Sequence, residues 1–396
     1  MLVRGFEAAQ RRHRLRRLLA GRQLGEEIGG RGGHSCDRPF EGMVRALRRR
    51  VHTADLPHVL ARSCLDLFGC CVGFEPTERC DVAAHAAHAT ATPHLDMAPD
   101  PCPCQHLRMT TETQRWKVGN ATITSVVEDE IHHIPPELFF PAATAAAVGE
   151  HPWLVPDFTD ERGNIALRVQ AFVVEIGFRR VLVDPCVGNN KKRAIPFWSE
   201  MTWPFIERFT ESGFDAADID TVVHTHLHAD HVGWDTHFVD GDWVPTFTKA
   251  RHLYTERELA YCRAGGNPGI DGVYADTVAP ILDAGLADIV DEDADLGDGL
   301  RLEPSTGHTP GHVSMWIESS GERALITGDF LHHPVQCEVP EWAEIGDHDA
   351  DVARTTRRRM LTRAAETGAL VLGTHFSTRP AGRVIAEGDA WRFVPE

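Results

Sequence analysis

The stretch Thr225-His226-Leu227-His228-Ala229-Asp230-His231 directs the interpretation of the whole sequence. In an extended segment, side chains two positions apart point the same way, so His226 and His228 are expected to face one point together. Asp230 and His231 follow where the chain must turn, and we expect them to face a second point nearby. Imidazole and carboxylate groups suit Zn²⁺, Fe and Mn. The stretch therefore predicts a metal site directly after a short apolar strand.

Three further strand ends carry residues of the same chemical type. In Thr306-Gly307-His308-Thr309-Pro310-Gly311-His312, the glycines and the proline enforce a tight turn that would hold His308 rigidly. His312 is expected to support a ligand rather than to bind metal itself. Asp329 ends the run Leu325-Ile326-Thr327-Gly328-Asp329, and His375 ends Leu370-Val371-Leu372-Gly373-Thr374-His375. Either residue alone has a structural explanation, but together with the first stretch they predict one metal centre.

Composition excludes several classes of protein. The chain has 396 residues, 42% of them hydrophobic, so it can bury a sizeable core. No stretch of about 18 apolar residues exists, which argues against a membrane-spanning helix. The formal net charge is −18, and the 24 basic and 46 acidic residues after Arg108 concentrate the negative charge there. We therefore expect neither nucleic acid nor an anionic membrane as a partner.

Residues 1–108 differ from the rest of the chain. They contain 16 Arg, no Lys and seven of the ten Cys. Three interpretations compete: a disordered or weakly helical extension, a Cys/His metal module, and a start placed upstream of a true start at Met109. The spacings of Cys70-Cys71 and Cys102-Pro-Cys104 are too irregular for paired C-x₂-C ligands. We predict an Arg/Cys/His-rich extension over 1–108 that is disordered or not part of the native chain, followed by a catalytic domain over 109–396.

The order of elements after residue 109 indicates an α/β architecture. Apolar runs predict strands over 121–127, 171–176, 180–184, 219–223, 251–254, 300–304, 313–318, 324–327 and 370–373. Helical spacing predicts helices over 203–212, 256–263, 277–284 and 349–366. This order suits two sheets with helices outside them, a four-layer α/β/β/α sandwich. Without an export signal, and with cysteines that look unpaired, the chain is expected in the reducing cytoplasm.

These motifs together resemble the metallo-β-lactamase fold superfamily, from about residue 122 to residue 375. The resemblance implies two divalent metal ions, with Zn²⁺ expected and Mn, Co or Fe as alternatives. It assigns one metal to His226, His228 and His308, and the other to Asp230, His231 and His375, with Asp329 bridging the two. It also implies that Asp184 orients a ligand rather than binding metal.

The resemblance further implies hydrolysis. A hydroxide shared by the two cations would attack a carbonyl or phosphoryl centre, while Asp230 binds metal and steers the proton. Quorum-quenching lactonases of this fold carry a Tyr three residues after the bridging Asp, but this chain has His332 there. That His looks more like the methyl parathion hydrolase branch, and it is expected to act as a general acid or hydrogen-bond donor beside the scissile bond. We predict an uncharged ester, lactone or phosphotriester as substrate.

Other enzymes of the fold stay open at this point. A thioester hydrolase of the glyoxalase II type is one alternative, although no C-terminal basic cluster is set up for glutathione carboxylates. A persulfide dioxygenase with a single iron is another. The only partner expected is a small-molecule substrate, and association as a homodimer stays open.

Large rings in loop contexts are the candidates for a substrate pocket. They lie in Leu138-Phe139-Phe140 and Phe197-Trp198, and at Trp203 and Trp234. An apolar mouth over two cations would favour uncharged substrates with an alkyl or aryl body. A place in the core or in a dimer contact is the alternative for each ring.

Overall fold

The computed structural model describes residues 113–396, so the predictions for 1–108 and for a start at Met109 lie outside the described residues. Within these residues the β-structure consists of two seven-stranded sheets and one hairpin. The first sheet contains, in spatial order, β1 (Arg115–Val118), β2 (Ala121–Ile134), β3 (Ile165–Ile176), β4 (Arg179–Val183), β5 (Thr221–Val223), β8 (Arg251–Thr255) and β9 (Ala287–Val290). The second contains β10 (Asp295–Gly297), β11 (Leu300–Pro304), β12 (Val313–Ser319), β13 (Glu322–Ile326), β14 (Leu370–Leu372), β15 (Ala381–Glu387) and β16 (Ala390–Pro395). The hairpin pairs β6 (Thr236–Val239) with β7 (Asp242–Pro245).

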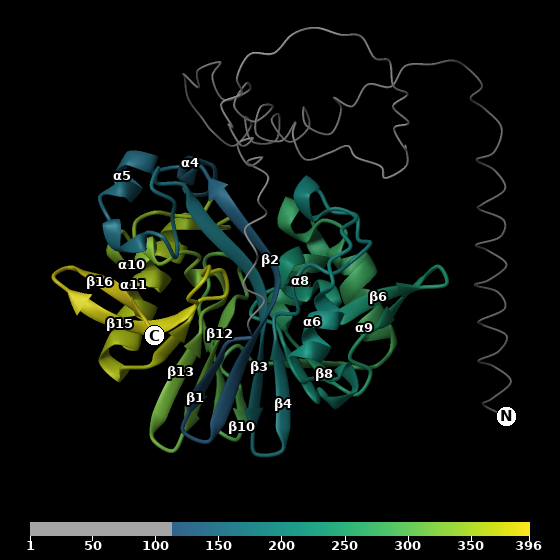
Figure 1. Ribbon diagram of the computed structural model, residues 1–396. Helices are drawn as coiled ribbons and strands as arrows, with labels where there is room; N and C mark the ends of the chain where they lie inside the picture. The colour runs from purple at the N-terminus through teal and green to yellow at the C-terminus, as the bar shows by residue number, and fades with distance from the viewer. Residues whose placement is uncertain (1–112) are drawn as a thin grey trace, which may run out of the picture. The chain divides into compact units, whose positions relative to one another are not determined.

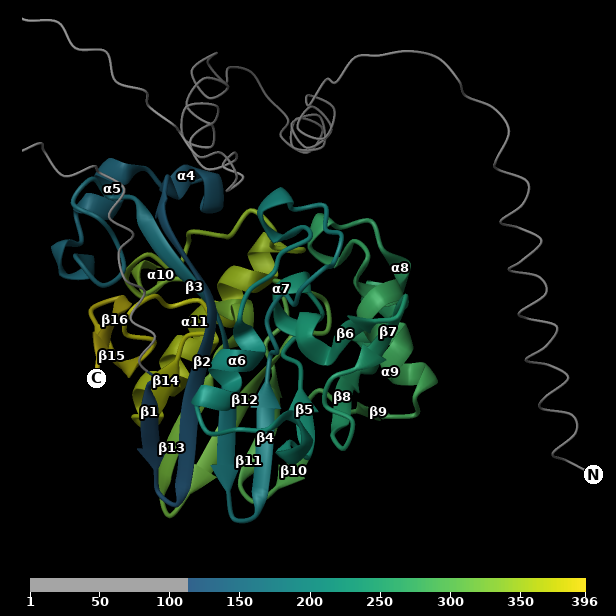
Figure 2. The ribbon, with the colours of Figure 1, turned by 45° about the vertical axis from the view of Figure 1, so that its right-hand side comes forward.

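The helices flank these sheets. They are α4 (Pro136–Phe139), α5 (Ala145–Gly149), α6 (Phe205–Glu211), α7 (Ala229–Val232), α8 (Glu256–Ala264), α9 (Ala279–Asp283), α10 (Val335–Glu338) and α11 (Ala350–Thr367). Figures 1 and 2 show the two sheets face to face, with α6, α8 and α9 beside the first sheet and α10 and α11 beside the second. Within the described residues, no helix is long and apolar enough to cross a membrane.

Burial of apolar side chains explains the layers. Between the sheets, Phe172 of the first packs in one cluster with Met315 and Ile326 of the second. On the outer face of the second sheet, α11 buries Met360 against the strands, and α6 buries Phe205 against the first sheet. Each such side chain contributes about 1.5–3 kcal/mol when it leaves water. The predicted four-layer α/β/β/α sandwich is confirmed.

The directions of the strands place the predicted ligands at one edge. β4 and β5 run parallel, and so do β13 and β14. The carboxyl ends of parallel neighbours lie at the same edge of a sheet, so residues that follow these strands emerge close together. Asp184 follows β4, the histidine stretch follows β5, Asp329 follows β13 and His375 follows β14. The fold therefore brings together segments that are far apart in the sequence.

Two expected elements differ from those observed. β2 continues to Ile134, whereas the predicted strand ended at Val127. The alternation of apolar residues breaks there because the strand shifts register against β3 between Val127 and Asp129. Glu128 lies at this irregularity, and its buried carboxylate accepts hydrogen bonds from the backbone N–H groups of Val187 and Gly188. The helix expected over 277–284 begins instead as a π-turn, Tyr274–Val278, and continues as α9.

Candidate metal centre

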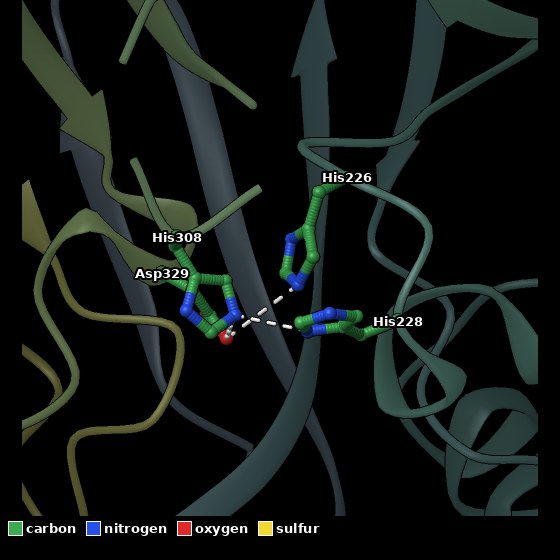
Figure 3. A group of neighbouring side chains, drawn as sticks. All are labelled: His226, His228, His308 and Asp329. Carbon is green, nitrogen blue, oxygen red and sulfur yellow. Dashed lines mark hydrogen bonds and ion pairs between the residues drawn. The ribbon is translucent and has the colours of Figure 1, made fainter. Parts of the chain in front are cut away.

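Four of the predicted ligands converge at the edge where the strands end. Figure 3 shows His226 and His228 entering from the segment after β5, and His308 and Asp329 entering from the opposite side. The Nδ1 atom of His228 lies 2.9 Å from His308 Nε2. Asp329 Oδ2 lies 3.4 Å from His308 Nε2 and 3.6 Å from His226 Nε2. All four side chains are buried, so their donor atoms face one another rather than water.

The remaining predicted ligands, Asp230, His231 and His375, form a second group beside the first. The Nε2 atoms of His231 and His375 lie 3.2 Å apart, and each lies 3.6 Å from Asp230 Oδ2. Asp329 also contacts this group, at 3.2 Å from His231 Nε2 and 3.1 Å from His375 Nε2. One carboxylate therefore touches both groups, which is the arrangement that a bridging ligand requires.

The hydrogen bonds of the outer ring nitrogens show that this donor set fits divalent cations. His231 Nδ1 lies 3.0 Å from Asp184 Oδ2, and His375 Nδ1 lies 2.8 Å from the Arg168 carbonyl oxygen. Because these oxygens can only accept, each Nδ1 carries the hydrogen, and Nε2 is the nitrogen left to bind a metal ion. The two Nε2 atoms lie 3.2 Å apart in a buried site. Burial opposes protonation of the two rings, but Asp329 outweighs it and raises both pKa values, so positive charge is favoured at the place where a cation would bind.

The outer ring nitrogen of His308 is also held by an oxygen acceptor. Its Nδ1 lies 3.0 Å from Asp347 Oδ1, which fixes the lone pair on the Nε2 that faces His228. Asp347 lies in the loop before α11, and Glu344 lies nearby at 3.9 Å from the same Nδ1. No motif in the sequence marks either residue as part of the centre. Acidic residues are common at the start of a helix, and Asp349 does cap α11 by accepting the N–H groups of Asp351 and Val352.

His312 supports the centre, as its place in the sequence suggested. Its Nε2 accepts the backbone N–H of Asp329 at 2.8 Å, and its Nδ1 lies 2.8 Å from Ser305 Oγ. Burial lowers the pKa of His312 to about 3, so the ring stays neutral and able to accept. Asp184 has a comparable role, because its carboxylate binds His231 Nδ1 together with the N–H and hydroxyl of Thr225.

The electrostatics of the cluster keep ligand atoms available. Burial holds the pKa values of His226 and His228 well below their usual range, so both rings are neutral. Burial opposes ionisation of Asp329, but His231 and His375 outweigh it and hold the pKa of that carboxyl well below normal. Neutral imidazole and ionised carboxylate are the forms that bind metal ions.

His332 lies within the centre. Its Nε2 is 3.2 Å from Asp329 Oδ2, and its ring stacks on that of His375 at a centroid distance of 5.7 Å. Burial lowers the pKa of His332 to about 4, and its Nδ1 has no hydrogen-bond partner among the described residues. Phe139 contacts the same ring edge-on at 5.4 Å.

The other rings expected at a substrate pocket lie elsewhere. Trp234 belongs to the core: it is 5% exposed, stacks on Phe205 at 5.4 Å and donates its Nε1–H to Glu128. The expectation that Trp234 lines a pocket beside the metals is therefore wrong, because long-range packing against α6 decides its place. Phe140 is buried in the cluster that contains Trp342, and Phe197 is 52% exposed.

Comparisons with known proteins agree with this architecture. The family model of the metallo-beta-lactamase superfamily matches residues 165–375, more than half of the chain. Among solved structures, hydrolase AbOPH of the beta lactamase superfamily is 23% identical with a TM-score of 0.60, over 72% of this chain and 97% of that one. AidC, a dizinc quorum-quenching lactonase in complex with the product N-hexanoyl-L-homoserine, is 20% identical with a TM-score of 0.60, over the same shares. A comparison with curated proteins finds no match. The chain belongs to the metallo-beta-lactamase superfamily.

Proposed function

We propose that this metal-dependent hydrolase of the metallo-beta-lactamase superfamily works with two divalent cations, Zn²⁺ by preference, on uncharged esters, lactones or phosphotriesters. One observation carries the proposal: the Asp329 carboxylate lies 3.1–3.6 Å from ring nitrogens of both ligand groups. His226, His228 and His308 would hold one cation, and Asp230, His231 and His375 the other. The lactonase activity of AidC supports a related chemistry.

The residues around the cations have separate tasks in this proposal. Two bound divalent cations would bring the pKa of water from 15.7 towards ~7 and polarise a carbonyl or phosphoryl oxygen. Asp230 would hold the proton that leaves this water, because its carboxylate lies beside both His231 and His375. His332 would donate a hydrogen bond to the leaving oxygen through Nε2–H, the ring nitrogen that lies beside Asp329 in the centre.

The charge balance supports an uncharged substrate. The centre holds Asp230 and Asp329, and Asp347 stands behind His308. Burial raises the pKa of Glu344 to about 8, so that carboxyl adds little negative charge at neutral pH. These groups nearly balance two divalent cations, which leaves little surplus positive charge to attract an anionic thioester. Phe139 at the edge of His332 would contact an apolar body.

A substrate panel measured beside metal analysis tests the proposal. We expect rate constants on aryl esters and on γ- and δ-lactones to rise with the apolar group, with a phosphotriester as a further substrate. Phe139→Ala should lower these constants about tenfold. Phe178→Ala, at the exposed turn between β3 and β4, serves as the control and should change nothing. Cleavage of anionic thioesters alone, or one iron with oxygen uptake on a persulfide, would contradict the proposal.

The extent of the catalytic unit, the partners and the location are further proposals. The domain over 109–396 should carry the full activity, because every proposed metal ligand lies within 226–375. A chain shortened to start at Met109 should turn over substrate at the rate of the full chain. Loss of folding on this deletion would show that 1–108 is structural. A small-molecule substrate as the only partner, and the cytoplasm as the location, stay predictions.

A further inference from the structure

A second cluster of metal-binding residue types lies outside the centre. His224 directly follows β5, Asp235 ends the 3₁₀ turn Gly233–Asp235, and His252 lies in β8. His224 Nε2 lies 2.9 Å from Asp235 Oδ2, and His252 Nδ1 lies 3.1 Å from Asp235 Oδ1. All three residues are at most 4% exposed, so water does not compensate for their polar atoms.

The tautomer of His224 is fixed by its backbone contact. Its Nδ1 lies 3.0 Å from the carbonyl oxygen of Leu253, which can only accept a hydrogen bond. The Nε2 atom is therefore the one that faces the Asp235 carboxylate, at 2.9 Å. The ligands of the main centre show the same pattern at His231 and His375.

Four atoms of this cluster lack a hydrogen bond among the described residues. They are His224 Nε2, Asp235 Oδ1 and both ring nitrogens of His252. A buried polar atom without a partner destabilises the folded state, so four such atoms in one cluster indicate that a further group binds there. His252 Nε2 has no partner among the described residues, and a cation held between His224 Nε2, His252 Nδ1 and the Asp235 carboxylate would satisfy the other three atoms.

We propose that His224, Asp235 and His252 form a third, structural site for a divalent cation of the Zn²⁺ class. Two ring nitrogens and both oxygens of Asp235 offer four donor atoms, the number that a closed structural zinc site uses. The hydroxyl of Tyr254 donates to Asp235 Oδ2 at 3.1 Å and fixes the orientation of the carboxylate. The site is independent of the two ligand groups around Asp329.

The position of this site gives it a task. His224 lies two residues before His226, and Asp235 lies four residues after His231, so the two residues flank the ligand-bearing stretch. His252 belongs to β8, which pairs with β5 on the same sheet. A cation held by all three residues would tie both ends of the ligand-bearing stretch to the sheet. The third cation would therefore stiffen the segment that supplies His226, His228, Asp230 and His231.

Metal analysis of the full chain, purified without chelators, tests this inference. Asp235→Asn and His252→Gln should each hold one equivalent of divalent metal fewer than the wild type. Asp288→Asn, an exposed Asp on the neighbouring strand β9, is the matched control and should retain every equivalent. Because this cluster flanks the ligand-bearing stretch, an anomalous map of each variant must show that the lost equivalent comes from the cluster and not from the Asp329 centre.

An anomalous diffraction map of the wild-type protein provides a test that needs no variant. We expect a peak enclosed by His224, Asp235 and His252, in addition to those beside Asp329. Variants that fold and keep the wild-type metal content would overturn the inference. A map with no peak at this cluster, in crystals that show metal beside Asp329, would overturn it too.

Discussion

Replacement of Asp184 by Asn tests how the second ligand group is oriented. One carboxylate oxygen of Asp184 accepts the N–H of Thr225 at 2.8 Å, and the other accepts the Thr225 hydroxyl at 2.8 Å and His231 Nδ1–H at 3.0 Å. An amide cannot accept at both positions. If its NH₂ faces His231, the ring must move its hydrogen to Nε2, and the lone pair that would bind metal is lost.

The substitution is otherwise conservative. Asp184 has a φ of 53°, a left-handed conformation that Asn tolerates well. Loss of such an orienting partner lowers metal affinity by about 10–100-fold, equivalent to about 1.4–2.7 kcal/mol. We therefore expect Asp184→Asn to bind its weakest metal equivalent about 10- to 100-fold less tightly than the wild type does.

Competition with a chromophoric chelator measures this affinity. Asp218→Asn is the matched control, because Asp218 is 50% exposed and its ion pair with Arg180 is worth at most about 1 kcal/mol. The control should bind metal as the wild type does. If Asp184→Asn holds all metal equivalents with wild-type affinity, the tautomer argument for His231 is refuted.

Two other predictions follow from the histidines around the centre. His312→Ala should lower activity about 10–100-fold, which is less than the loss expected for His308→Ala. The reason is that His312 accepts the N–H of Asp329, whereas His308 is proposed to bind metal. Equal losses of the two variants in steady-state kinetics would contradict this ranking. Burial lowers the pKa of His333 to about 4, and its Nδ1 accepts the N–H of Val335 while Nε2–H donates to the Phe158 carbonyl. The neutral ring therefore contributes stability above pH 6.5 that is lost as the pH falls through 4. In this window the free energy of unfolding of His333→Gln, measured with urea, should depend less steeply on pH than that of the wild type, by up to about 1.4 kcal/mol per pH unit. Parallel slopes for the variant and the wild type would refute the lowered pKa of His333.

The sequence predicted the parts of the fold that depend on local pattern. β11 spans the predicted residues 300–304, and α11 follows Asp349 as the predicted helix did. The proposed ligands were found because each follows an apolar strand directly. Parallel pairing of β4 with β5 and of β13 with β14 then gathers them at one edge.

The parts that sequence reasoning missed depend on contacts between distant segments. Glu128 looked like the end of a strand, but its carboxylate is satisfied by backbone that lies 59 and 60 residues further along the chain. Trp234 stood beside the histidine stretch and suggested a pocket, yet its ring packs on α6. Asp347 acts through His308, a contact across 39 residues that no local motif reveals.

The central claim is that one carboxylate joins two cations, and anomalous diffraction tests it most directly. Crystals of the protein with its own metal, measured at the absorption edge of that metal, should show two peaks beside Asp329. One peak should lie about 2.0–2.2 Å from nitrogens of His226, His228 and His308, and the other at the same distance from ligand atoms of Asp230, His231 and His375. A single peak beside Asp329, or two peaks of which only one contacts it, would contradict the account.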